Sequence, residues 1–158
     1  MYRIAFITVI VGFLGGCTPA IPMSASVDLA RRSSIEQSID ITRQKNYLIE
    51  FRFSRDGVQF EKLKELVGAM GLCQIGAICS RGIAIPVRWS LQSDDKKVVA
   101  SGELATIDSS GWASADVSRL IGNFSADTGR YSFKLEILKD VPELAFLKTR
   151  VVIYHRTK

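Results

Sequence analysis

The sequence between residues 47 and 53 constrains the fold of this chain more than any other segment. Large apolar side chains occupy every second position, and Leu48, Glu50 and Arg52 stand between them. An alternation with a period of two places alternate side chains on one face of a β-strand. This face is too apolar to be left in water, so the strand needs a second layer to cover it. The apolar set is Tyr47, Ile49, Phe51 and Phe53.

Other segments show the same period or a high content of apolar residues, and polar turns separate them. The polar residues 93–96 lie between two such segments, which we expect to form a hairpin. The short segment 27–29 is a candidate for a first edge strand. The expected strands cover residues 35–41, 47–53, 83–91, 98–107, 131–137 and 151–154.

The period changes after residue 57. Apolar side chains then recur every three or four positions, and charged side chains take the opposite side, as in an amphipathic helix. We expect one such helix over about residues 57–70, with Asp56 as its N-cap and Gly68 or Gly71 at its end. The apolar face consists of Phe60, Leu63, Leu66, Val67 and Met70.

Residues 112–124 fit two interpretations. Val117, Leu120, Ile121 and Phe124 have helical spacing, whereas the flanking residues look like a loop and a strand. The sequence leaves this choice open. About seven short strands and one helix, separated by polar turns, predict a mainly β protein. The expected fold is an antiparallel, immunoglobulin-like β-sandwich.

The first seventeen residues have the pattern of a secretory signal. Arg3 precedes an apolar run from Ile4 to Leu14, and Gly15-Gly16-Cys17 follows. The run is too short to span a bilayer, which takes about 20 apolar residues. The ending resembles the bacterial lipobox, in which the cysteine accepts a diacylglycerol and the chain is cut before it. Plain secretion and a membrane anchor are the alternatives.

These features divide the chain into a cleaved signal peptide at residues 1–16, a lipidated tether at 17–32 and a sandwich domain at 33–158. Thr18 follows the cysteine, and an outer membrane location facing the periplasm is favoured because no Asp stands there. The formal net charge is +5, with signs interspersed. This does not indicate nucleic-acid binding, but it favours contact with acidic partners or anionic lipid head groups.

Cys73 and Cys79 remain as an even pair if Cys17 is lipidated. An oxidising compartment favours a disulfide between them. Two free buried thiols are the alternative. A metal site is not expected, because the chain has no further cysteine and its one histidine is His155.

The sequence gives no positive indication of an enzyme. His155 lies three residues from the end, and neither a G-x-S-x-G nor an H-E-x-x-H motif occurs. The nearest groups of carboxylates, Asp94-Asp95 and Asp140 with Glu143, look like turn residues. We therefore expect no catalytic residue, no cofactor, no metal and no small-molecule ligand.

Near the end of the chain, a G-x-Y strand at residues 129–138 leads through a D-x-P-E-L turn at 140–144 to the last strand at 151–153. With residues 121–124 and 47–53, this order resembles the domain-of-unknown-function 5625 family of small bacterial lipoproteins. The resemblance covers most of the chain from about Ile35. It implies a sandwich fold and no catalytic residues.

Together these observations favour a membrane-anchored envelope lipoprotein that acts as a non-enzymatic protein-binding module. Its partner would be another envelope or secreted protein, as for immunity proteins or accessory factors of a secretion system. A structural envelope component and a periplasmic hydrolase are alternatives, the second less favoured. Leu72, Ile75 and Ile78 are the candidate partner contacts, unless they are buried in the core.

We expect cells grown with a radioactive fatty acid to label this protein at Cys17. The change Cys17→Ser should leave an unlabelled protein that is either uncleaved or soluble, because the acceptor sulfur is gone. Fractionation and autoradiography of both proteins measure this. A wild-type protein that takes up no label would contradict the lipoprotein assignment.

Overall fold

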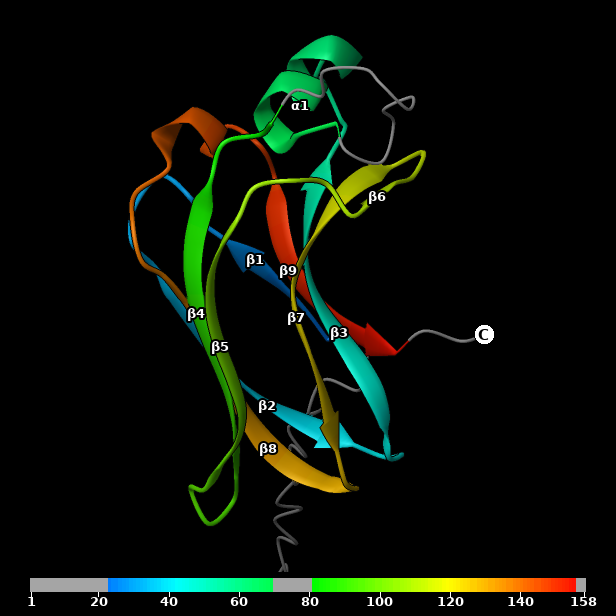
Figure 1. Ribbon diagram of the computed structural model, residues 1–158, viewed down its shortest axis with the longest axis vertical. Helices are drawn as coiled ribbons and strands as arrows, with labels where there is room; N and C mark the ends of the chain where they lie inside the picture. The colour runs from blue at the N-terminus through cyan, green and yellow to red at the C-terminus, as the bar shows by residue number, and fades with distance from the viewer. Residues whose placement is uncertain (1–22, 70–80, 156–158) are drawn as a thin grey trace, which may run out of the picture.

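The computed structural model describes residues 23–69 and 81–155 of the chain (Figure 1). The strands form two antiparallel sheets, one with the order β1-β9-β3-β7-β6 and one with the order β2-β8-β4-β5. One α-helix and a short 3-10 helix lie at one end of the sandwich, and the β4–β5 turn lies at the other. The elements are β1 (Met23–Val27), β2 (Ser34–Ile41), β3 (Lys45–Ser54), α1 (Phe60–Val67), β4 (Ile85–Ser93), β5 (Val98–Thr106), β6 (Gly111–Trp112), β7 (Asp116–Ala126), β8 (Gly129–Ile137), η2 (Pro142–Leu144) and β9 (Thr149–His155).

The two inner faces bury the apolar side chains that alternate along the strands, which confirms the predicted β-sandwich. All four large groups of β3 are buried, and Phe51 and Phe53 have no exposed surface. In the facing sheet, Phe133 and Leu135 of β8 belong to the same core. The alternation in the sequence therefore identified the core-facing residues of the central strands correctly.

The strand connections differ from the predicted immunoglobulin-like arrangement. The first half of the chain pairs with the second half in nested order: β1 with β9, β2 with β8, β3 with β7 and β4 with β5. This is one long antiparallel hairpin folded over into two sheets, the connectivity of a jelly roll. Immunoglobulin and jelly-roll sandwiches share the same alternation within strands, so the sequence pattern could not separate them.

Two short strands bring the number in the described residues above the expected seven. β1 lies within the predicted tether of residues 17–32, but it pairs with β9 and buries Met23 and Val27. The apolar alternation of β1 is weak in the sequence because its three middle residues are serine and alanine. β6 has two residues, too few to show a period. Residues 112–124, which the sequence left open, form part of β6 and most of β7 rather than a helix.

Helix α1 is shorter than the expected range of about 57–70. Its N-cap is Gln59 rather than Asp56, and Gly68 ends it with a φ of 87°, a left-handed value that suits glycine. Leu63, Leu66 and Val67 are buried, as the periodicity predicted. Within residues 23–69 and 81–155, no helix has the length and apolar character needed to cross a membrane.

Arg119 of β7 attaches α1 to the sheet. Its side chain is fully buried, although its neighbours Val117 and Ile121 are apolar core residues. Its guanidinium donates four hydrogen bonds to backbone carbonyls. The acceptors are the oxygens of Val67 (2.8 Å), Leu66 (2.9 Å), Ile83 (2.6 Å) and Thr106 (3.3 Å).

Two of these carbonyls end α1, where the helix dipole favours a cation and the last carbonyls lack helical partners. Burial lowers the pKa of Arg119 to about 10, and the charge of Asp108 opposes this shift. The side chain therefore stays charged at neutral pH. Gly82 leaves room for it, since a Cβ there would lie 2.1 Å from Nη2 of Arg119.

We expect Arg119→Met to lower the free energy of unfolding by about 3–5 kcal/mol, because it leaves buried carbonyls without donors. Arg130→Met is the matched control, since Arg130 is exposed and should change stability by less than about 0.5 kcal/mol. Urea unfolding followed by circular dichroism measures both. Equal effects of the two variants would show that Arg119 does not hold the helix.

Candidate functional site

The outer face of the four-stranded sheet has the charge pattern of an ordinary solvated surface. Its basic side chains are about half exposed, at 45–58%, and its acidic ones are 29–56% exposed; the two kinds pair with each other at short distances. Such pairs contribute about 0–1 kcal/mol each. The contacts are Arg88–Glu103 (2.8 Å), Lys134–Glu136 (2.6 Å) and Arg130–Asp40 (3.1 Å).

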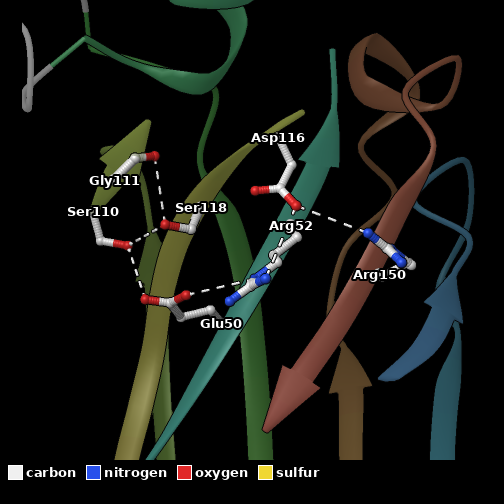
Figure 2. Close-up of polar contacts among 7 residues, drawn as sticks. All are labelled: Glu50, Arg52, Ser110, Gly111, Asp116, Ser118 and Arg150. Carbon is white, nitrogen blue, oxygen red and sulfur yellow. Dashed lines mark hydrogen bonds and ion pairs between the residues drawn. The ribbon is translucent and has the colours of Figure 1, made fainter. Parts of the chain in front are cut away.

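The outer face of the five-stranded sheet is different, because it holds a partly buried polar group that we call the outer-face cluster (Figure 2). Its centre is one row of residues in register across all five strands. The row places Arg150 of β9 directly opposite Arg52 of β3. In order, the row is Ser26, Arg150, Arg52, Ser118 and Gly111. The cluster consists of Glu50, Arg52, Ser110, Asp116, Ser118, Arg150 and Tyr154.

The same alternation that builds the core builds this cluster. Glu50 and Arg52 separate the buried apolar groups of β3, so they project from the opposite face. On β7, Asp116 and Ser118 alternate in the same way with the buried Val117 and Arg119, so they also project from the outer face.

The two carboxylates of the cluster lie below its surface. The side chain of Glu50 is 8% exposed and that of Asp116 is 17% exposed. The Ser110 hydroxyl donates to Oε1 of Glu50 at 3.4 Å, and the hydroxyls of Ser110 and Ser118 lie 3.2 Å apart.

The two guanidinium groups are more exposed and less closely held. The side chain of Arg52 is 32% exposed and that of Arg150 is 53% exposed. Arg52 lies 4.0 Å from Glu50 and 4.0 Å from Asp116, and Arg150 lies 3.8 Å from Asp116. All three distances exceed the 2.7–3.2 Å that is typical of a hydrogen bond. The buried Nε of Arg52 has no hydrogen-bond partner.

Tyr154 completes the cluster on β9. The guanidinium carbon of Arg52 lies 5.1 Å from the centre of its ring, within the range of a cation–π contact. Burial raises the pKa of Tyr154 and the charge of Glu50 raises it further, while Arg52 lowers it. The phenol therefore stays protonated at neutral pH.

An open pocket of about 590 Å³ adjoins the cluster at Arg150. We call it the strand-end pocket, because it lies where β1 and β3 end and β9 begins. Beside it, between Ala145 and Leu147, the side chain of Phe146 is exposed, at 59% for the whole residue. The lining residues are Ser26, Val27, Asp28, Ser54, Asp56, Ala145, Leu147, Lys148, Thr149 and Arg150.

A pair of aromatic rings lies at the same end of the molecule. The ring of Phe60 on α1 is exposed and packs against Trp112 of β6, with centroids 5.3 Å apart. Arg55 and Lys64 both lie over the Phe60 ring, at 5.5 and 5.3 Å. Ala69, the last described residue before the gap, closely follows α1 in the sequence.

The residues that the sequence singled out for lipidation, a disulfide and partner contact lie outside the described residues. They are Cys17, Cys73, Cys79, Leu72, Ile75 and Ile78. His155 ends β9, its ring 6.0 Å from that of Tyr47. The D-x-P-E-L segment is structural: Val141 and Leu144 are buried, and Asp140 accepts a hydrogen bond from the Arg32 amide at 2.8 Å.

The outer-face cluster was missed, although its strand was recognised. The signal was present in the opposite charges of Glu50 and Arg52 within an apolar strand. Asp116 and Arg150 join them only through strand pairing. Among the described residues, no group of three or more His, Cys, Asp or Glu side chains is placed to hold a metal ion. The cluster presents the N–H donors of Arg52 and Arg150 at the surface.

The described residues thus form a small jelly-roll β-sandwich with a partly buried cluster of charged side chains on one outer face. Its sequence matches the family described as Domain of unknown function (DUF5625) over residues 27–155, and the chain belongs to that family.

The structure is similar to a crystal structure of a protein from Sulfurospirillum deleyianum. The TM-score is 0.67 with 20% identity, covering 87% of this chain and 98% of that one. This similarity supports the fold alone. The pre-peptidase C-terminal domain of a collagenase from Bacillus anthracis is more distant, with a TM-score of 0.38, 11% identity and coverage of 85% and 90%, and carries no argument. Comparison with curated proteins gave no match.

We expect Glu50→Ala to lower the free energy of unfolding by about 1–3 kcal/mol, because Ser110 and Arg52 lose a buried partner. Glu103→Ala is the matched control on the other sheet, where the exposed pair with Arg88 contributes less than about 1 kcal/mol. The pKa of Tyr154 should also fall in Glu50→Ala, since a negative charge is removed. Chemical denaturation and a titration of the tyrosine resonances measure these changes. An unchanged Tyr154 titration would contradict the effect of the Glu50 charge on the pKa of Tyr154.

Proposed function

We propose that this protein is a membrane-anchored envelope lipoprotein whose jelly-roll domain binds a protein partner through the outer face of the five-stranded sheet. The lipid at Cys17 holds the domain at the outer membrane, facing the periplasm. The partner is another envelope or secreted protein, and the domain acts by binding rather than by catalysis. Immunity to a secreted toxin and accessory work in a secretion system are functions of this kind.

The observation that carries this proposal is the contrast between the two outer faces. On the four-stranded sheet, Arg88, Arg130 and Lys134 each have one carboxylate at hydrogen-bond distance. The five-stranded sheet instead carries two arginines with no carboxylate within hydrogen-bond distance, and it adjoins the strand-end pocket, beside which Phe146 is exposed. Arginine and aromatic residues are enriched at protein interfaces and dominate their binding energy. A sheet face that served the fold alone would not need this composition.

The sequence supports the anchored location. Gly15-Gly16-Cys17 follows an apolar run of signal-peptide length, and β1 begins six positions after Cys17. An oxidising periplasm also supports a disulfide between Cys73 and Cys79. The described residues on either side of that segment, Ala69 and Arg81, follow α1 and precede β4.

A steric block tests the binding face without changing its charges. Ser26 on β1 and Ser38 on β2 are both exposed and project from opposite outer faces. Tagged full-length Ser26→Trp, Ser38→Trp and wild-type protein are cross-linked in cells and recovered from detergent-solubilised envelope. We expect the partner to be retained by Ser38→Trp and reduced about tenfold or more in Ser26→Trp, a loss of about 1.4 kcal/mol.

Thermal unfolding of both variants shows whether the domain remains folded. Equal recovery of the partner by both variants would place the binding surface elsewhere. A wild-type protein that cross-links to no specific partner would contradict the proposal and favour a structural envelope component.

A further inference from the structure

We infer that the outer-face cluster recognises an acidic segment of its protein partner, whose carboxylates bind Arg52 and Arg150. This inference rests on the proposed function and specifies the chemistry of the partner. Three observations support it: the depth of the charged groups, the spacing of the two arginines and the hydrogen-bonding capacity left to them.

The negative groups of the cluster are more deeply buried than its positive groups. The carboxylates of Glu50 and Asp116 are 8% and 17% exposed, whereas Arg52 and Arg150 are 32% and 53% exposed. An approaching molecule therefore meets guanidinium groups before it meets carboxylates. The cluster has no net charge, yet the surface that it presents is positive.

The register brings the two guanidinium groups together. Arg52 and Arg150 are direct cross-strand partners on adjacent strands and project from the same face. Like charges in this position repel each other. Asp116 is the carboxylate that approaches both of them, at 4.0 and 3.8 Å. A second carboxylate placed above the pair would relieve the remaining repulsion.

Both arginines keep donors that could bind such a group. A guanidinium has five N–H donors in a planar fork that matches a carboxylate, at about 2.7–2.9 Å for a close contact. The carboxylates in the cluster stay about 1 Å beyond that range. Arg88 on the other sheet is different, because Glu103 already accepts its hydrogen bond at 2.8 Å. Arg52 and Arg150 are therefore better placed to accept a new partner.

The surroundings favour a protein segment over a polyanion. Lys148 lines the strand-end pocket and adds a third cation, but Asp28 and Asp56 line it as well. These carboxylates would repel the continuous row of phosphates of a nucleic acid. Proteins that bind nucleic acids usually present an uninterrupted stripe of basic residues instead. A peptide can place its acidic residues over the arginines and an apolar residue against Phe146.

The test is a titration of the purified mature protein with two capped peptides, hexaglutamate and hexalysine, followed by NMR. We expect hexaglutamate to shift the signals of Arg52, Arg150 and Tyr154 in a saturable way and hexalysine to leave them unchanged. The affinity should fall when salt is raised from about 0.1 M to about 1 M, since the screening length shortens from about 10 Å to about 3 Å. Shifts that map instead to the four-stranded sheet would overturn the inference.

Variants separate this site from general attraction by a basic protein. Arg52→Gln with Arg150→Gln should weaken hexaglutamate binding about tenfold, as expected for the loss of charge-assisted hydrogen bonds. Arg88→Gln with Arg130→Gln removes the same charge from the other sheet and should leave the affinity unchanged. Arg150→Gln alone, at an exposed position, keeps the test valid if the first double variant is poorly folded. Equal loss in both double variants would overturn the inference.

The outcome can be separated from that of the proposed function. If Ser26→Trp loses the cellular partner while both Arg→Gln variants of the cluster keep it, the face binds a protein but not through an acidic segment. If the arginine variants bind hexaglutamate weakly and no cellular partner depends on Ser26, the site recognises carboxylates but the proposed function fails.

Discussion

The attachment of α1 to the sheet depends on the hydrogen bonds of one buried cation. Arg119 lies in the core at a position where the strand alternation calls for an apolar side chain, and it binds the carbonyls of four residues from three separate segments. A buried guanidinium is costly unless its N–H donors find acceptors. The end of α1, the start of the path into β4 and the end of β5 therefore have to meet at one point, and this fixes that end of the sandwich.

The same end carries the features that we associate with binding. Arg119 projects inward from β7, while its neighbour Ser118 projects outward into the row that contains Arg52 and Arg150. One strand thus supplies both the residue that binds the end of the helix and part of the outer-face cluster. The two outer faces of the sandwich therefore differ. The face of the four-stranded sheet has close pairs of exposed charges, as between Arg88 and Glu103, whereas the face of the five-stranded sheet presents arginines above more deeply buried carboxylates.

The strands that could be predicted from the sequence are those whose alternation is long and strongly apolar. Residues 47–53 and 131–137 identified both central strands and the side chains that face the core. β1 was assigned to a tether because serine and alanine alternate weakly, and β6 is too short for any period. The pairing of strands, and therefore the jelly roll and the meeting of Asp116 with Arg150, depends on contacts between distant segments. Alternation within one strand carries no information about its neighbours.

The nested pairing of the strands has a consequence for the order in which the strands can pair. The β4–β5 hairpin is local and can form early, whereas β1 and β3 both require β9, the last strand of the domain. Contacts between such distant segments form slowly, because the intervening chain must lose its entropy first. During synthesis from the N-terminus, β1 therefore remains without its partner until β9 has been made. A chain that emerges in this way exposes an unpaired strand for that interval, which is when it is most open to aggregation.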